Sequence, residues 1–377
     1  MDGDAGGIAA GYSCVSHRAR RAGSLARAAR ACRARASVVA AAIAITASLL
    51  VAGCAAPGGP NLDAALTIER QGSFFVGGRT IVSETLSTLP AYMPKGTISV
   101  EQMYVRFQVP AGEKRAPVVF IHGCCLTGKT WETTPDGRMG WDEYFVRSGH
   151  PTYVVDQVAR GRSAGNIVAI NAVRMGKLPV DQLPTVFSVG AEDAWMIFRF
   201  GPEHPKQFPG MKFPLQAAGE LWKQTVPDWI QSMPTPNPTT AALSELAQRL
   251  NGAVLISHSQ SGIYPFQTAI RSRAGIAGIV SIEPGACPAA EGDMTPYKGM
   301  PILVLWGDFV DQSPRWAPRL KACREFVRAA SAAGARAENV VLPEIGIAGN
   351  SHMLMQDSNS LEIARWLAAW LAKNVGR

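Results

Sequence analysis

Short apolar runs recur along the chain from about residue 98, separated by turn residues and by helical patterns. Runs such as Val118-Val119-Phe120-Ile121 are continuously apolar, as strands buried on both faces should be. This alternation predicts an α/β fold, with a mostly parallel central sheet and helices on both faces. The predicted strands cover residues 98–109, 116–121, 151–155, 253–257, 278–282, 301–306 and 339–342.

The alternation stops between residues 164 and 250. This stretch contains Trp195, Trp222 and Trp229 and a proline cluster at 234–238. Because an unstructured loop of this length is unusual, we expect it to hold helices and to form a cap insertion over the sheet. The tryptophans fit either an apolar substrate pocket or the core of the cap itself. A last helix is predicted over 361–373, with an apolar face that packs on the core.

The N-terminus has the order of an export signal. An arginine-rich stretch precedes an apolar run at 36–52, which is shorter than the roughly 20 residues of a membrane span. The residues Leu50-Val51-Ala52-Gly53-Cys54 resemble a bacterial lipobox. We therefore expect a lipoprotein-type signal peptide over 1–53, a lipid anchor on Cys54, a tether over 54–71 and a catalytic domain over 72–377. This places the protein in the periplasm or at the outer membrane. Ordinary cleavage near Ala55, giving a secreted protein, is the alternative.

The net charge of +8 is concentrated in that segment. Seven arginines and two aspartates precede Cys54, a net of 7 − 2 = +5, so 8 − 5 = +3 is left for the remainder. This small, scattered charge gives no indication of a nucleic-acid partner.

The candidate nucleophile is Ser259. An apolar strand ending at Ser257 runs into His258-Ser259-Gln260-Ser261-Gly262, a small-x-Ser-x-small turn followed by a helical segment. This is the pattern of a nucleophile elbow, in which a sharp turn lifts the serine hydroxyl above the sheet edge. Ser261 is a weaker candidate, because Ile263 would then occupy a position that favours a small residue.

A serine nucleophile needs a base and an orienting carboxylate, which follow it in the order acid, then histidine. His352 is the only histidine after Ser259 and comes just after the last predicted strand. Two places offer the acid: Glu283, at the end of the strand after the nucleophile, or Asp308 and Asp311, after the next strand. The residues alone leave this choice open.

Two backbone N–H groups should stabilise the oxyanion that forms during acyl transfer. One belongs to Gln260, the residue after the serine. The other belongs to Cys124, in the loop His122-Gly123-Cys124-Cys125 that follows an earlier strand.

Together these motifs resemble a small group of secreted bacterial esterases within the α/β-hydrolase superfamily, whose loop reads His-Gly-Cys-Cys and whose elbow reads His-Ser-Gln-Ser-Gly. The resemblance implies the α/β-hydrolase fold, a disulfide between Cys124 and Cys125, Glu283 as the acid and His352 as the base. Ser257 departs from the glycine of that pattern. If the resemblance holds, Cys287 and Cys323 remain as a second pair.

The sequence thus predicts a carboxylic ester hydrolase with a small, apolar ester as its substrate. The alternatives are another serine hydrolase, such as an amidase, a thioesterase or a polyester depolymerase, or a non-catalytic binding protein on the same fold. We assign no metal, since no second Cys/His pair stands at ligand spacing, and no cofactor.

Overall fold

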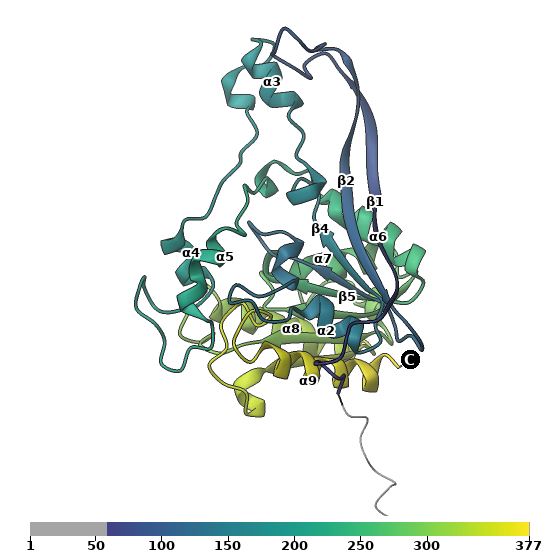
Figure 1. Ribbon diagram of the computed structural model, residues 1–377, viewed down its shortest axis with the longest axis vertical. Helices are drawn as coiled ribbons and strands as arrows, with labels where there is room; N and C mark the ends of the chain where they lie inside the picture. Colours follow the sequence, from purple (N-terminus) through teal and green to yellow (C-terminus); the bar gives the residue numbers. More distant parts are fainter. Residues whose placement is uncertain (1–58, 377) are drawn as a thin grey trace, which may run out of the picture. The chain divides into compact units, whose positions relative to one another are not determined.

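Eight strands form a single sheet in the computed structural model, which describes residues 59–376 (Figure 1). The strand order is β1-β2-β4-β3-β5-β6-β7-β8. The six strands from β4 to β8 in this order run parallel, whereas β1 and β2 pair antiparallel at one edge. The sheet is therefore mostly parallel, as predicted. The strands are β1 (Ile68–Ser83), β2 (Gly96–Pro110), β3 (Val118–Ile121), β4 (Thr152–Asp156), β5 (Ala253–His258), β6 (Ile276–Ile282), β7 (Pro301–Trp306) and β8 (Arg336–Val341).

Helices cover both faces of the sheet. Successive side chains of a strand point to opposite faces, so Val254 and Ile256 of β5 pack in one cluster and Ala253 and Leu255 in another. One face is covered by α2 and α9, and the other by α6, α7 and α8. These helices are α2 (Trp141–Arg147), α6 (Pro238–Leu250), α7 (Tyr264–Arg271), α8 (Ala317–Ala332) and α9 (Ser360–Asn374).

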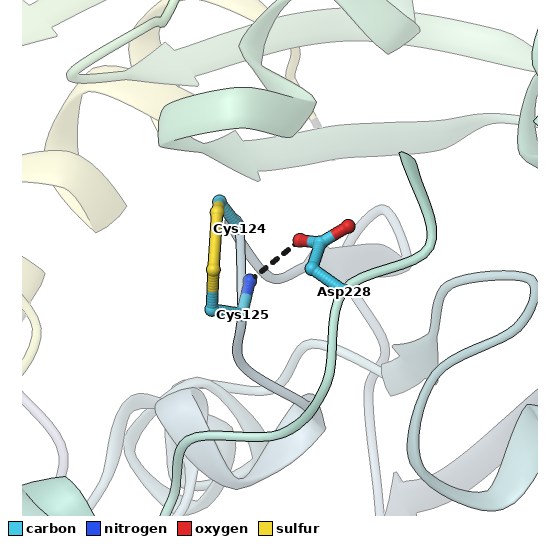
Figure 2. A group of neighbouring side chains, drawn as sticks. All are labelled: Cys124, Cys125 and Asp228. Carbon is cyan, nitrogen blue, oxygen red and sulfur yellow. Dashed lines mark hydrogen bonds between the residues drawn. A yellow bond between two sulfur atoms is a disulfide. The ribbon is translucent and has the colours of Figure 1, made fainter. Parts of the chain in front are cut away.

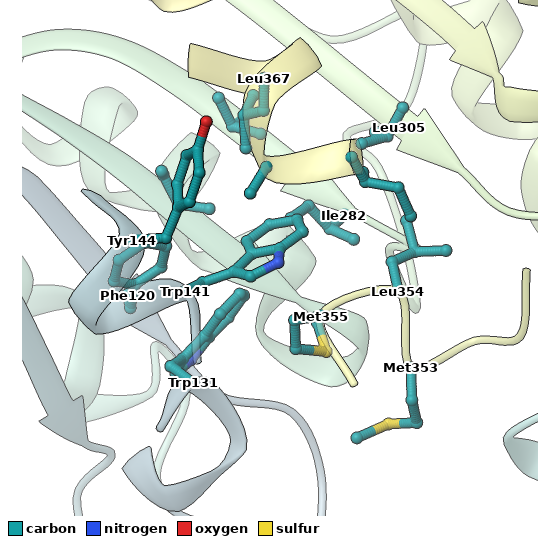
Figure 3. Packing of buried hydrophobic residues seen from close by; sticks show 14 of the residues in the cluster. Phe120, Trp131, Trp141, Tyr144, Ile282, Leu305, Met353, Leu354, Met355 and Leu367 are labelled. Atoms are coloured by element: carbon teal, nitrogen blue, oxygen red, sulfur yellow. The ribbon is translucent and has the colours of Figure 1, made fainter. Parts of the chain in front are cut away.

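The largest cluster of buried side chains lies between the sheet and the helices α2 and α9. Figure 3 shows Trp141 and Tyr144 of α2 in this cluster with Leu367 of α9. The rings of Phe120 and Trp131 stack with centroids 4.7 Å apart. Each large apolar side chain buried in this way stabilises the fold by about 1.5–3 kcal/mol, and together they hold the sheet rigid beneath its loops.

All seven predicted strands are present, with ends shifted by up to three residues. The sequence pattern missed β1, most of whose residues are exposed, so its apolar positions form no continuous run. β1 begins at Ile68, within the segment expected as a tether. The signal peptide, Cys54 and the first residues of the tether lie outside the described residues.

The insertion (residues 164–250) contains helices, as predicted: α3 (Val168–Arg174), α4 (Ala191–Ile197), α5 (Ala218–Trp222) and α6. α3 lies at the far end of the β1–β2 hairpin (Figure 1), where Thr85 Oγ1 donates a hydrogen bond to Val168 O. α6 packs on β1 and α7 and so belongs to the layers of the sheet. Across residues 59–376 we find no helix long and apolar enough to cross a bilayer.

Candidate functional site

Ser259 stands at the carboxyl end of β5, where the strand turns into a short 3-10 segment, Ser259–Ile263, and then into α7. Its φ angle of 58° lies in the left-handed region that non-glycine residues rarely adopt. The sharp strand-to-helix turn predicted from the sequence is therefore present. Ser259 keeps 6% of its surface exposed.

The residues around Ser259 are small because the backbone segments approach closely. A Cβ atom on Gly123 would lie 2.8 Å from Ser259 Cβ and 3.0 Å from His258 Nδ1. A Cβ atom on Gly262 would lie 2.5 Å from Pro284 Cβ. Glycine at 123 thus lets the His-Gly-Cys-Cys loop fit against the elbow, and glycine at 262 lets the elbow fit against the loop after β6.

The hydroxyl of Ser261 has a structural role. Its Oγ lies 3.1 Å from Ile121 O and 3.0 Å from His258 O, and the residue is fully buried. A hydroxyl tied to two backbone carbonyls is poorly placed to attack a substrate, so the geometry favours Ser259 over Ser261 as the nucleophile.

Glu283 and His352 are brought together at the same edge of the sheet. His352 Nδ1 lies 3.0 Å from Glu283 Oε2, and both residues are fully buried. His352 Nε2 is buried without a hydrogen-bond partner among the described residues. The Nδ1 hydrogen bond leaves Nε2 as the nitrogen that can accept a proton.

The other two candidate acids are engaged elsewhere or exposed. Asp308 Oδ2 accepts a hydrogen bond from Gly349 N at 2.8 Å, and Asp308 Oδ1 accepts one from Phe309 N at 2.7 Å. Asp311 is exposed. Of the three carboxylates, the one that contacts His352 is Glu283.

Arg199, from the insertion, also binds Glu283. Its Nη1 and Nη2 donate to the two carboxylate oxygens at 2.5 and 2.6 Å, and its Nε donates to Asp308 O at 3.0 Å. Arg199 is buried, and Nη1 lies 3.4 Å from His352 Nδ1. An arginine thus neutralises the carboxylate that orients the histidine.

These contacts set the charge states of the pair. Burial alone would raise the pKa of Glu283, but Arg199 and His352 hold it at about 2. Burial lowers the pKa of His352 to about 4; the hydrogen bond and charge of Glu283 oppose this fall, and the charge of Arg199 adds to it. At neutral pH the site therefore holds an ionised glutamate and a neutral histidine.

Two other histidines lie next to the site. His258 Nε2 donates to His352 O at 2.9 Å, so its ring is bound to the backbone of the segment that carries His352. His122 Nε2 accepts from Gln157 N at 3.0 Å, and His122 Nδ1 lies 2.8 Å from Gly123 O. Burial lowers the pKa of both imidazoles, so both act as neutral hydrogen-bonding groups.

The loop after β3 carries the disulfide that the resemblance implies. Cys124 and Cys125 are bonded, with Cα atoms 3.8 Å apart. Figure 2 shows this disulfide beside Asp228 of the insertion, whose Oδ2 accepts a hydrogen bond from Cys125 N at 2.8 Å. Two thiols and a carboxylate could ligate a metal, but here the sulfurs are bonded to each other and Asp228 is already engaged.

The second pair of cysteines is bonded as well. Cys287 follows Glu283 by four residues, and its partner Cys323 lies on α8, with Cα atoms 5.2 Å apart. This bridge ties the loop that carries Glu283 to a helix packed on the sheet.

Four residues of the site share a left-handed backbone conformation. Cys125, Arg199, Ser259 and Glu283 have φ angles of 60°, 55°, 58° and 52°. Each such residue costs of order 1 kcal/mol or more, and this kind of strain gathers at functional sites. These four are half of the eight non-glycine residues with positive φ among the described residues.

The structure adds three charged residues that the sequence did not single out: Arg160, Arg199 and Asp228. Arg160 is 4% exposed and the other two are 1% exposed or less. The one signal available in the sequence was the presence of charged residues within otherwise apolar stretches, such as Arg199 in Phe198-Arg199-Phe200.

No protein-family model matches the chain. One solved structure, described as that of "a Novel Bacterial Esterase", is 58% identical in sequence and superposes with a TM-score of 0.82, covering 85% of this chain and 99% of that one. A "Probable secreted lipase phiG" of Fungal sp. (strain ATCC 74256) is 26% identical over 330 residues, or 72% of this chain and 86% of the lipase.

Proposed function

The chain belongs to the bacterial esterases of the α/β-hydrolase superfamily, and from this premise we propose that it cleaves carboxylic esters through an acyl-enzyme intermediate on Ser259. His352 is the general base and Glu283 is the acid that orients it. The observation that carries the proposal is the 3.0 Å hydrogen bond from His352 Nδ1 to Glu283. His258, which directly precedes Ser259 in its strained turn, donates a hydrogen bond to His352 O and so ties this pair to the turn.

The reaction follows from these roles. Ser259 Oγ attacks the ester carbonyl carbon while His352 Nε2 takes the hydroxyl proton. The carbonyl oxygen becomes an oxyanion, stabilised by the N–H groups of Cys124 and Gln260. His352 then passes the proton to the alcohol as the C–O bond breaks. Water, activated by the same histidine, hydrolyses the acyl-serine and releases the carboxylic acid.

An apolar substrate fits the surroundings of His352. The rings of Trp316 and Phe198 have centroids 4.1 and 6.1 Å from the centroid of the His352 ring. Trp316 and Phe198 belong to the hydrophobic core, and Trp195, Trp222 and Trp229 of the insertion pack in or against it as well. These rings therefore make the surroundings of His352 apolar without themselves defining a substrate pocket. We propose a small ester with an apolar acyl or alcohol part.

Export is part of the proposal. Two disulfides are typical of oxidising compartments, and the related lipase is described as secreted. The lipobox at Leu50 to Cys54 supports a lipid anchor on Cys54 and placement in the periplasm or at the outer membrane.

The assignment of the acid is tested by Glu283→Gln, with Asp308→Asn and Asp311→Asn as matched variants. Losing the carboxylate that orients His352 should lower kcat by about 100-fold or more, whereas the other two should stay within a few-fold of wild type. Rates of p-nitrophenyl ester hydrolysis are divided by the concentration of active sites titrated with a fluorophosphonate. A larger loss in Asp308→Asn than in Glu283→Gln would overturn the assignment.

A further inference from the structure

A buried ion pair joins the insertion to both proposed oxyanion donors. Arg160, in the turn after β4, has its Nη2 2.6 Å from Asp228 Oδ1. Side-chain exposure is 3% for Arg160 and 0% for Asp228. An ion pair buried this deeply is costly to desolvate and adds little net stability, so its retention calls for another explanation.

The pair contacts the loop of Cys124 on both sides of that residue. Arg160 Nη1 lies 3.4 Å from Gly123 O, and Asp228 Oδ2 accepts the N–H of Cys125 at 2.8 Å (Figure 2). The backbone of the insertion adds a third contact, because Val226 N donates to Cys125 O at 2.8 Å.

Peptide planarity makes these contacts directional. The carbonyl of Gly123 and the N–H of Cys124 belong to one planar trans unit and point in opposite directions. Holding Gly123 O from one side, by Arg160 and by His122 Nδ1 at 2.8 Å, therefore aims the N–H of Cys124 to the other side. Asp228 fixes the following peptide plane through the N–H of Cys125.

The same guanidinium reaches the second donor residue. Arg160 Nη1 donates to Gln260 Oε1 at 3.0 Å, and Gln260 Nε2 donates to Tyr264 OH on α7. With its side chain held at both ends, Gln260 has little freedom to shift its backbone N–H. One arginine thus contacts the carbonyl of the peptide unit that contains the Cys124 N–H, and also the side chain of Gln260, 100 positions away in sequence.

We propose that Arg160 and Asp228 are positioning residues that aim the Cys124 and Gln260 N–H groups at the reacting oxygen, so that the insertion completes the oxyanion hole. The inference rests on the proposed function. Stabilisation by an oxyanion hole depends on donors fixed in advance of the reaction, so a small displacement reduces the rate more than it reduces substrate binding.

The test uses Asp228→Asn and Arg160→Lys, which keep much of the side-chain volume but lose the charge pair or the planar fork. Arg162→Lys is the matched control, because Arg162 lies in the same turn and pairs with Asp156 without contacting Gly123, Cys125 or Gln260. For each variant, kcat and KM for a p-nitrophenyl ester are measured per fluorophosphonate-titrated site. The Ki of an alkyl trifluoromethyl ketone, which forms a tetrahedral adduct with the serine, is measured alongside.

We expect Asp228→Asn and Arg160→Lys to lower kcat by about 10-fold or more with KM within about 3-fold, and to weaken the ketone by the same factor as kcat/KM. The control should match wild type. A variant with a lower melting temperature but wild-type kcat and Ki per titrated site would overturn the inference. A variant whose KM rises while kcat stays at the wild-type value would overturn it as well. Ser259→Ala distinguishes a failure of this inference from a failure of the proposed function. Turnover that survives in Ser259→Ala refutes the proposed function itself.

Discussion

Arg199 changes what the Glu283 carboxylate can do for His352. In a serine hydrolase the acid both orients the histidine and stabilises its protonated form. Here the carboxylate is bound by a guanidinium through both oxygens, so its charge is already balanced. The proposed acid can still orient His352, while it stabilises the imidazolium less. Burial chiefly, with a smaller contribution from the charge of Arg199, brings the pKa of His352 to about 4.

Arg199→Met should therefore move the acid limb of the pH profile of kcat/KM to higher pH. A base acts when it is neutral, so activity falls as the pH drops through the pKa of His352. Without the nearby positive charge, Glu283 attracts the imidazole proton unopposed and that pKa rises, although burial still holds it below the ordinary value of a histidine. Profiles of wild type and variant on the same ester measure the shift.

The matched control is Arg174→Met, an exposed arginine of the same insertion. Breaking a buried ion pair also costs about 3–5 kcal/mol of stability, so rates are taken per titrated active site at low temperature. An acid limb that stays in place, or moves to lower pH, would contradict this role of Arg199.

Sequence motifs and chain order predicted Ser259 and His352 as members of the site, whereas the choice of Glu283 over Asp308 and Asp311 came from the resemblance to the esterase group. Ser259 and Glu283 directly follow β5 and β6, and parallel strands bring those ends to one edge, whereas His352 lies in the long segment after β8. Arg199 and Asp228 could not be predicted in the same way. They meet their partners across 84 residues for Arg199 and Glu283, and 103 for Asp228 and Cys125, and they lie in an insertion without regular periodicity.

At the scale of elements, the strands buried on both faces were predictable because burial imposes a continuous apolar run. The edge strand β1 was missed because most of its residues are exposed and so form no continuous apolar run. It is a strand because its backbone pairs with β2. The Cys287–Cys323 disulfide depends on packing between the loop after β6 and α8, so its geometry emerges only from the fold.

Removing that bridge with Cys287→Ser and Cys323→Ser should lower the melting temperature more than the rate. The bridge closes a loop between residues 36 apart in sequence. In the chain-entropy model, a disulfide that closes such a loop raises the free energy of unfolding by about 4 kcal/mol. Glu283 keeps its ion pair with Arg199, so kcat at 25 °C should stay within a few-fold. Thermal unfolding and ester hydrolysis of the double variant measure both. An unchanged melting temperature would refute the stabilising role.

At the scale of the whole molecule, the protein is an esterase domain whose insertion supplies two buried charged residues to the proposed site. Arg199 contacts the proposed acid, and Asp228 contacts the proposed oxyanion loop. The insertion is therefore more than a cover over the sheet. The break in periodicity marked this stretch of the sequence, but these contacts could not be predicted from it.

The proposed placement of the protein is tested at Cys54. Cys54→Ser removes the lipid-accepting thiol and should move the protein from the membrane fraction to the soluble fraction, because a lipid chain is then absent. Ala56→Ser is the matched control and should stay in the membrane fraction. Fractionation followed by an esterase assay measures both, and a Cys54→Ser protein that remains with the membrane would refute the anchor.

The measurement that tests the central claim most directly is the intact mass of wild type, Ser259→Ala and Ser261→Ala after a fluorophosphonate, with ester turnover by the same samples. We expect wild type and Ser261→Ala to gain one adduct, because the Ser261 hydroxyl serves the backbone. Ser259→Ala should gain none and hydrolyse no p-nitrophenyl ester. An adduct or turnover that survives in Ser259→Ala would contradict the account.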